Sequence, residues 1–380
     1  MRWEGRTLGV EDTSALPGMR QLAGFVRTVR TPEFAGVTFH EVHSKSALNK
    51  VPGNSPMPLG WTINPYRGCT HGCVYCFARG THSYLEFDTG HDFDTQIVVK
   101  TNIGSVLRKE LSAPKWQRDH VAMGTNTDPY QRAEGRYRLM PEIISALADS
   151  GTPFSILTKG TVLSRDLGLL GAASSSVSVG IGVSLALLDP ELQATLEPGT
   201  PSPKARLDLV RRIRAAGLPC GVFIAPLLPY LTDTEEQIDA LVAELADAGV
   251  TGVSGIGLHL RPGAREWFFH WLGDNRPDLL HPYQQLYARG ANLPKDYRRA
   301  LSARIKAVSS RHGLGPSAED GMAGRNTRAR RPTDNRNADN GSPQPATGVP
   351  GDREASFPRG SLPATAPAAI QDVSPEPVLF

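Results

Sequence analysis

Three of the four cysteines in this chain of 380 residues lie close together. Cys69, Cys73 and Cys76 follow the spacing C-x3-C-x2-C, whereas Cys220 stands alone far downstream. Thiolates at such short spacing are typical ligands of zinc and of iron–sulfur clusters. Zinc usually takes four ligands from two separated pairs, and only one C-x2-C pair is present, with His71 or a distant residue left to complete a site.

Two structural alternatives concern the same cysteines. Positions i, i+4 and i+7 share a helix face, so the three side chains could be ordinary core residues. Pro65, Gly68 and Gly72 disfavour a helix here, and a disulfide is uncommon in an intracellular chain. A glycine-punctuated loop favours an iron–sulfur cluster, because its backbone can turn sharply and approach inorganic sulfide. Three local thiolates leave the fourth iron of a cubane open to an exogenous chelating ligand.

The stretch Cys69-x3-Cys73-x-Tyr75-Cys76 resembles the signature of the radical S-adenosylmethionine superfamily. The resemblance implies that these cysteines hold a 4Fe–4S cluster whose unique iron is chelated by S-adenosylmethionine. It implies reductive cleavage to a 5′-deoxyadenosyl radical that abstracts hydrogen from a substrate, with a reductant such as flavodoxin or ferredoxin. The alternative is a non-catalytic iron–sulfur protein for electron transfer or redox sensing, which would need a fourth protein ligand.

The elements that must position this loop alternate between strands and helices. Helical patterns cover residues 141–150, 205–216 and 234–248, and each is followed by a glycine. The third begins with Thr234 and Gln237 at the spacing of a capping box. Six β-like runs cover residues 62–65, 120–124, 154–158, 177–187, 220–225 and 250–260. An insert between the first two of them contains a short β-like run at 96–100 and a helical pattern at 102–111. Together with the resemblance, this alternation predicts an α/β fold, a partial (β/α)6 TIM-like barrel of the radical SAM type.

Polar residues follow the expected strands at the edge where parallel β/α barrels carry their chemistry. The resemblance implies that Lys159 contacts the carboxylate of S-adenosylmethionine and Ser184 its ribose or carboxylate. Its remaining contacts would come from Asn126, Thr127, Asp128, Tyr75 and Phe77, the last through its backbone carbonyl at the adenine pocket. Strand-end Asn and Asp also form turns, a strand-end Lys also forms surface ion pairs, and the aromatics could be core residues.

A narrower resemblance rests on residues 64–69, 124–131 and 154–159. These stretches resemble the SplB-like branch, related to spore photoproduct lyase, and its uncharacterised actinobacterial radical SAM proteins. The substrate stays open between nucleic acid, a modified protein and a small molecule. Cys220, at the start of the fifth strand, is expected to be a buried structural thiol. Candidates for phosphate contact or plain surface charge are Arg132, Arg136, Arg138 and Arg206, and candidates for hydrogen-atom relay are Tyr66 and Tyr130.

The residue composition indicates the class of protein, and changes along the chain indicate the domain boundaries. With 39% hydrophobic residues, 21% charged residues and a net charge of +3, the chain can bury a core and carries no extreme charge. It contains neither a long apolar run nor a secretory signal, so we expect a cytoplasmic protein without a membrane span. Residues 1–50 are expected to wrap the barrel or extend its sheet, 51–312 to form the core, and 313–380 to be a disordered Pro-, Gly- and Arg-rich tail.

Overall fold

The computed structural model describes residues 24–52 and 59–315, which belong to one compact unit of the chain. The expected tail therefore lies outside the described residues, except for its first three positions.

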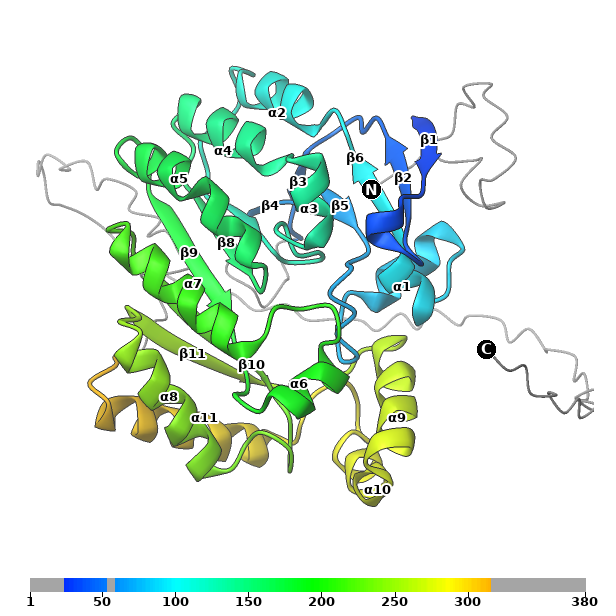
Figure 1. Cartoon of the computed structure of the whole chain (residues 1–380), viewed down its shortest axis with the longest axis vertical. Coiled ribbons are helices and arrows are strands. Elements are labelled where there is room, and N and C mark those ends of the chain that lie inside the picture. The colour runs from blue at the N-terminus through cyan, green and yellow to red at the C-terminus, as the bar shows by residue number, and fades with distance from the viewer. Residues whose placement is uncertain (1–23, 53–58, 316–380) are drawn as a thin grey trace, which may run out of the picture. The chain divides into compact units, whose positions relative to one another are not determined.

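A seven-stranded sheet lies at the centre of this unit (Figure 1). An antiparallel strand, β3 (Leu48–Lys50), forms one edge and pairs with β4. The six parallel strands are, in order across the sheet, β4 (Trp61–Ile63), β7 (Val121–Met123), β8 (Phe154–Thr158), β9 (Val179–Ser184), β10 (Gly221–Leu227) and β11 (Gly252–Gly257). Their spatial order follows their chain order, as successive β/α units give. The predicted partial (β/α)6 barrel is thereby confirmed, with β3 and β11 as its two edges.

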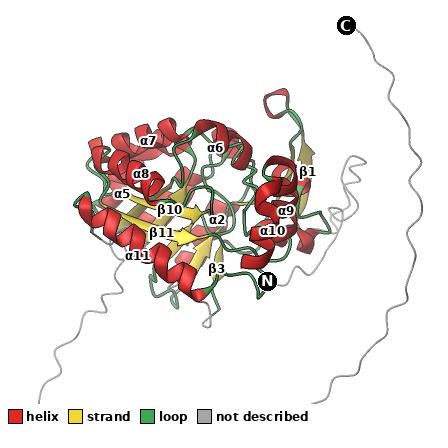
Figure 2. Cartoon of the chain, turned by 90° about the horizontal axis from the view of Figure 1, so that it is seen from below, coloured by secondary structure: helices red, strands yellow, loops and turns green. Residues whose placement is uncertain are grey.

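Helices cover the outer side of the strands (Figure 2). The predicted helices are α2 (Ile103–Leu111), α4 (Met140–Asp149), α7 (Pro203–Ala215) and α8 (Glu235–Asp247). The capping box of α8 has both of its hydrogen bonds, since Gln237 N–H donates to the Thr234 hydroxyl at 3.2 Å and Thr234 N–H donates to the Gln237 side chain at 3.3 Å. Further helices are α3 (Arg132–Tyr137), α5 (Leu167–Ser174), α6 (Pro190–Leu196), α9 (Ala264–Asn275), α10 (Pro277–Leu286) and α11 (Lys295–Arg311).

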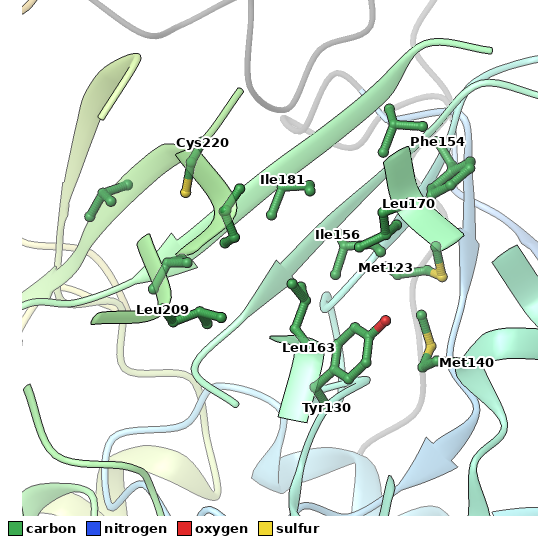
Figure 3. Close-up of a cluster of buried hydrophobic side chains, with 14 of the residues drawn as sticks. Met123, Tyr130, Met140, Phe154, Ile156, Leu163, Leu170, Ile181, Leu209 and Cys220 are labelled. Carbon is green, nitrogen blue, oxygen red and sulfur yellow. The ribbon is translucent and has the colours of Figure 1, made fainter. Parts of the chain in front are cut away.

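The core lies between the outer face of the sheet and these helices (Figure 3). Alternate strand residues point to opposite faces, and the outward set is large and apolar, as Phe154, Ile156 and Ile181 show. Cys220 is fully buried in the same cluster, and burial raises the pKa of its thiol to about 12. The prediction of a buried structural thiol is confirmed.

A second sheet has the order β1-β2-β6-β5. Its strands are β1 (Phe25–Val29), β2 (Thr38–Val42), β6 (Gln96–Lys100) and β5 (Tyr66–Arg67). The strand expected at 96–100 is present, although it pairs with β2 and β5 rather than within the barrel. Residues 24–50 thus form both the edge strand β3 and half of this second sheet. Strand β5 of the second sheet follows β4 of the barrel almost directly. The segment that leads into the cysteine loop is therefore paired with both sheets.

Candidate active site around the cysteine loop

The three clustered cysteines lie on turns between β5 and the 3-10 helix η3 (Arg79–Leu85). No helix runs through them, which excludes the core-helix alternative. All three thiols are free; Cys69 and Cys73 are buried and Cys76 is half-buried. Gly68 precedes them with a φ of +80°, and a Cβ there would lie 2.9 Å from the Phe93 carbonyl oxygen. The loop therefore requires glycine at this entry point.

The thiols lie in surroundings that disfavour unpaired negative charge. Burial raises the pKa of all three, and the Asp128 carboxylate adds to the effect at Cys69. Lys159 opposes it at Cys73 and Arg79 at Cys76. Among the described residues, no three His, Cys, Asp or Glu side chains form a site for a single metal ion. Three uncrosslinked thiols on one loop nevertheless fit an iron–sulfur cluster, whose cysteines bind different irons and need not converge on one point.

Arg79, three residues after the last cysteine, holds the loop from within. Its guanidinium is fully buried and donates to the carbonyl oxygens of Cys73 at 2.9 Å and Gly72 at 3.3 Å. It also pairs with Asp94 at 2.9 Å. Two aromatic rings face it, Phe93 at 5.2 Å and Trp267 of α9 at 5.1 Å from ring centroid to Cζ. Sequence analysis missed this residue, because a single arginine outside any motif carries no signal.

The loop after β7 fastens the cysteine loop from the other side. The Thr127 hydroxyl donates to the Gly68 carbonyl at 2.7 Å, and the Gln131 side chain accepts from Thr70 N–H at 2.8 Å. Asn126 is exposed, and its backbone N–H donates to the Asn64 side chain at 3.3 Å. Thr127 and Gln131 thus join the loop after β7 to the cysteine loop, whereas Asn126 contacts the segment between β4 and β5.

The Asp128 carboxylate contacts both the end of β8 and the cysteine loop. Its carboxylate accepts from the Thr158 hydroxyl at 2.5 Å and from Lys159 N–H at 2.7 Å, and lies 3.3 Å from Nδ1 of His71. Burial alone would raise the pKa of Asp128, but His71 and these donors outweigh it, so the pKa lies below its ordinary value. The carboxylate thus links the end of β8 to the cysteine loop.

Lys159, Ser184 and Tyr75 meet at the carboxyl ends of β8 and β9. The Lys159 ammonium donates to the Ser184 hydroxyl at 2.9 Å and lies 5.9 Å from the centroid of the Tyr75 ring. Ser184 in turn donates to the Ala225 carbonyl at 3.2 Å. Burial lowers the pKa of Lys159, but the Glu197 carboxylate and Cys73 outweigh it, so that the pKa is raised. The ammonium is therefore charged at neutral pH.

Glu197 and Arg206 form a fully buried ion pair behind Tyr75. The Tyr75 hydroxyl donates to Glu197, and Arg206 also donates to the Ser184 carbonyl at 3.1 Å. The expectation that Arg206 is a loop arginine available to phosphate is wrong, because α7 carries it into the interior. Glu197 was missed, since the sequence Glu197-Pro198-Gly199 is typical of a surface turn.

The remaining candidates lie apart from this site. Arg132, Arg136 and Arg138 are exposed on α3 and its C-terminal cap. The hydroxyls of the two candidate relay tyrosines donate to buried carboxylates, Tyr66 to Glu134 at 2.5 Å and Tyr130 to Asp166 at 3.1 Å. Both tyrosines are buried. Phe77, in contrast, is 37% exposed beside the last cysteine.

In the described residues, no helix is both long and apolar enough to cross a membrane.

Comparisons with known proteins identify the class. An uncharacterised protein of Mycobacterium tuberculosis is 55% identical over 318 residues, 83% of this chain and 93% of the relative. An uncharacterised protein of Acidianus two-tailed virus is 30% identical over 210 residues, 53% of this chain and 68% of that protein. Spore photoproduct lyase complexed with a dinucleoside spore photoproduct has a similar fold, with a TM-score of 0.57 at 16% identity over 78% of this chain and 87% of the lyase.

A second structure of that lyase, a mutant with bound AdoMet and the same dinucleoside, gives a TM-score of 0.56 at 16% identity over 73% of this chain and 79% of the lyase. At such identity the likeness shows the fold. The family model of the Radical SAM superfamily matches residues 63–255, just over half of the chain. Enzymes of this superfamily use a 4Fe–4S cluster and S-adenosylmethionine. The chain belongs to the radical SAM superfamily and is a radical SAM enzyme with an SplB-like fold.

Proposed function

We propose that Cys69, Cys73 and Cys76 hold a 4Fe–4S cluster and that Lys159 and Ser184 bind S-adenosylmethionine beside it. When bound, the cluster supplies the electron that cleaves S-adenosylmethionine to methionine and a 5′-deoxyadenosyl radical, which abstracts hydrogen from the substrate. The observation that carries this proposal is three free thiols on one loop that is hydrogen-bonded to the carboxyl ends of the barrel strands.

The chain's own residues bind and orient the methionine part of the ligand. The Lys159 ammonium, charged at neutral pH, attracts its carboxylate, and Ser184 fixes the direction of that ammonium. Asp128 acts through Lys159, because its carboxylate oxygens are engaged by Thr158, the Lys159 backbone and His71. These groups define one end of the ligand site.

Other residues shape the rest of the ligand site, from the Tyr75 ring beside Lys159 to Phe77 at the adenine. Tyr75 presents a ring whose hydroxyl is anchored on Glu197, and Phe77 offers its backbone carbonyl to the base. Asn126 is exposed at the strand end and has no side-chain hydrogen bond recorded within the described residues, which leaves its amide for the ligand. This distribution supports a site that extends from β8 and β9 to the cysteine loop.

We infer that the substrate is a nucleic acid. The support is the fold shared with spore photoproduct lyase, whose structures hold a dinucleoside photoproduct. The spore photoproduct lyase reaction itself is disfavoured, because that enzyme returns hydrogen through a further cysteine and Cys220, the one remaining cysteine of the sequence, is fully buried in the outer core. The electron would come from a reductant such as flavodoxin or ferredoxin.

Anaerobic reconstitution tests the cluster assignment. The wild-type protein should bind about four irons per chain, as one cubane requires. Changing Cys69, Cys73 or Cys76 to Ala should abolish the cluster, whereas Cys220→Ala is the matched control and should retain it. Iron loss in the Cys220→Ala protein, or stoichiometric zinc in place of iron, would contradict the assignment.

Reduction then tests the activity. Dithionite and S-adenosylmethionine should yield 5′-deoxyadenosine from the reconstituted protein even without substrate, measured by chromatography. A protein that holds both the cluster and the ligand but forms no 5′-deoxyadenosine under strong reduction would instead be an electron-transfer or redox-sensing protein.

A further inference from the structure

The loop after the edge strand β11 approaches the chain just beyond the last cysteine. The loop 258–263 follows the edge strand β11, and residues 77–80 follow Cys76. A Cβ at Gly80 would lie 3.1 Å from the Pro262 carbonyl oxygen, and one at Gly263 would lie 3.3 Å from the Gly80 Cα. The guanidinium of Arg261 lies 5.6 Å from the centroid of the Phe77 ring. Arg261 therefore lies next to the cysteine loop, beside the residue that follows Cys76.

Arg261 is exposed but held in place. Its Nε donates to His259 Nε2 at 3.0 Å, and Nδ1 of that imidazole lies 2.9 Å from the Asn292 side-chain oxygen. This arrangement requires a neutral imidazole that accepts from Arg261 and donates to Asn292. The loop itself is fixed because the Tyr287 hydroxyl donates to the Leu258 carbonyl at 2.8 Å. Such a guanidinium is oriented before any ligand arrives.

The charge of Arg261 lacks a carboxylate partner among residues 24–52 and 59–315, where no ion pair involves it. Other arginines near the site, Arg79 and Arg206, are buried and paired with acids. The terminal nitrogens of Arg261 thus face solvent, and their N–H groups are available as hydrogen-bond donors. A guanidinium stacked on an aromatic ring is a typical receptor for phosphate.

The inner face of β10 and β11, the strands that precede the Arg261 loop, offers an apolar surface. A Cβ at Gly255 or Gly257 would meet Ile305, Leu293 and Leu301, on and just before α11, so Ile256 between them points to the barrel interior. Ile256 is 56% exposed there. In the adjacent strand Phe223 is half-buried and lies in register with Ser184. Aromatic and aliphatic side chains on this inner face can contact the flat faces of nucleobases.

We propose that Arg261, positioned by His259 and Asn292, is the receptor for a phosphate group of a nucleotide substrate whose base lies against Phe223 and Ile256. This inference rests on the proposed function and deepens it by naming the group that the enzyme recognises. The phosphate belongs either to a nucleic acid strand or to a free nucleotide, and both present the same oxygen atoms to the guanidinium.

Binding of small probes to the reconstituted protein with S-adenosylmethionine, measured by equilibrium dialysis under anaerobic conditions, tests the proposal. The probes are the dinucleotide thymidylyl-thymidine, its uncharged methylphosphonate analogue, thymidine monophosphate, and hippurate as an aromatic carboxylate. The wild-type protein should prefer the charged dinucleotide over its neutral analogue by about 10- to 100-fold, the value of a charge-assisted contact. Arg261→Gln should reduce this preference to nearly one, and Arg261→Lys should retain part of it.

Arg299→Gln is the matched control, because Arg299 is an exposed arginine of α11 and pairs with Asp296 at 3.4 Å. Its preference should equal that of the wild type. Tighter binding of the dinucleotide than of the monophosphate assigns the phosphate to a strand, and the reverse assigns it to a free nucleotide. Equal binding of charged and neutral dinucleotides, preference for hippurate, or an unchanged preference in Arg261→Gln would overturn the proposal. Because dialysis needs no cleavage, failure of 5′-deoxyadenosine formation would count against the proposed function alone.

Discussion

Three buried cations next to the cysteine loop face acidic groups. Arg79 pairs with Asp94, Arg206 pairs with Glu197, and Glu197 also raises the pKa of Lys159. Removing such charges from water costs several kcal/mol per ion, and the partner offsets that cost only while both members are present. The positive charge that favours thiolates comes from Lys159 at Cys73 and from Arg79 at Cys76, and each buried pair is sensitive to the loss of one partner.

Glu197→Gln should show this sensitivity. The neutral amide leaves the buried Arg206 uncompensated, so the free energy of unfolding should fall by about 3–5 kcal/mol in urea titrations at pH 7. Glu244→Gln is the control, because Glu244 is half exposed and its carboxylate lies 3.9 Å from Arg211, and it should change stability by less than about 0.5 kcal/mol.

The Glu197 carboxylate should also make the free energy of unfolding depend on pH. Burial would raise the pKa of Glu197, but Arg206, Lys159 and the Tyr75 hydroxyl outweigh it, so the folded-state pKa lies below the ordinary value of 4.5. A carboxyl group whose pKa is lower in the folded than in the unfolded protein contributes its full stabilisation at pH values above the unfolded-state pKa. That contribution is lost as the pH falls through the folded-state pKa. The stability gap between wild type and Glu197→Gln should therefore narrow below pH 4.5; a gap that widens there would contradict the assignment.

Lys159 and Ser184 should differ in their effect on ligand binding. Lys159→Ala removes a charge-assisted contact and should weaken S-adenosylmethionine binding by about 10- to 100-fold. Ser184→Ala leaves the Lys159 charge in place and removes only the hydroxyl that orients the ammonium, so it should weaken binding by roughly 2- to 10-fold. Equilibrium dialysis with labelled ligand measures both, and the exposed Lys109→Ala is the control. Iron content should stay unchanged, and a larger loss in Ser184→Ala would reverse the proposed roles.

At the scale of elements, regular periodicity and terminal glycines made the barrel predictable. The strand at Phe154–Thr158 and the helix α8 were found where the pattern placed them. Short elements such as α6 and η4 (Thr161–Asp166) were not predicted, because so few residues carry too little periodicity. The cysteines were identified because their spacing is local. Arg79, Glu197 and Arg261 were not, because no local motif marks them and each also needs a partner far away in the sequence, Trp267, Tyr75 and Phe77 respectively.

The loop between α6 and α7 illustrates such a non-local requirement. Gly199 N–H donates to the His71 carbonyl at 2.9 Å, and a Cβ at Gly199 would lie 2.0 Å from the Thr70 carbonyl oxygen. Both groups are backbone, so no side-chain rotation relieves the contact.

Gly199→Ala should therefore displace this loop from the cysteine loop. We expect it to lower the free energy of unfolding by about 1–3 kcal/mol, as overpacking does, and to reduce iron retention. Gly135→Ala, in helix α3 with open space around the new methyl group, should instead be neutral or stabilise by up to about 1 kcal/mol. Urea unfolding and iron analysis after desalting measure both, and an unaltered Gly199→Ala protein would show that the loops need no close contact.

At the scale of the described molecule, the last helices complete a site that begins some two hundred residues earlier in the chain. Trp267 of α9 covers the guanidinium of Arg79, and Arg79 binds the carbonyl oxygens of Gly72 and Cys73. The loop before α9 likewise carries Arg261 to the Phe77 ring. The open edge at β11 is thus joined to the cysteine loop through side chains rather than through strand pairing, and the conformation of that loop depends on α9.

Trp267→Leu should therefore loosen the cysteine loop specifically. Losing the ring removes a cation–π contact of roughly 0.5–2 kcal/mol from Arg79, so the loop should open more often. In iron-free protein, a thiol reagent should label Cys73 and Cys76 several-fold faster than in the wild type. Trp271→Leu is the matched control, since Trp271 lies on the same helix and stacks on Phe268 at 5.7 Å without facing Arg79. It should lower the melting temperature but leave the labelling rate unchanged. Equal labelling in the two variants would mean that α9 stabilises the fold without setting the shape of the loop.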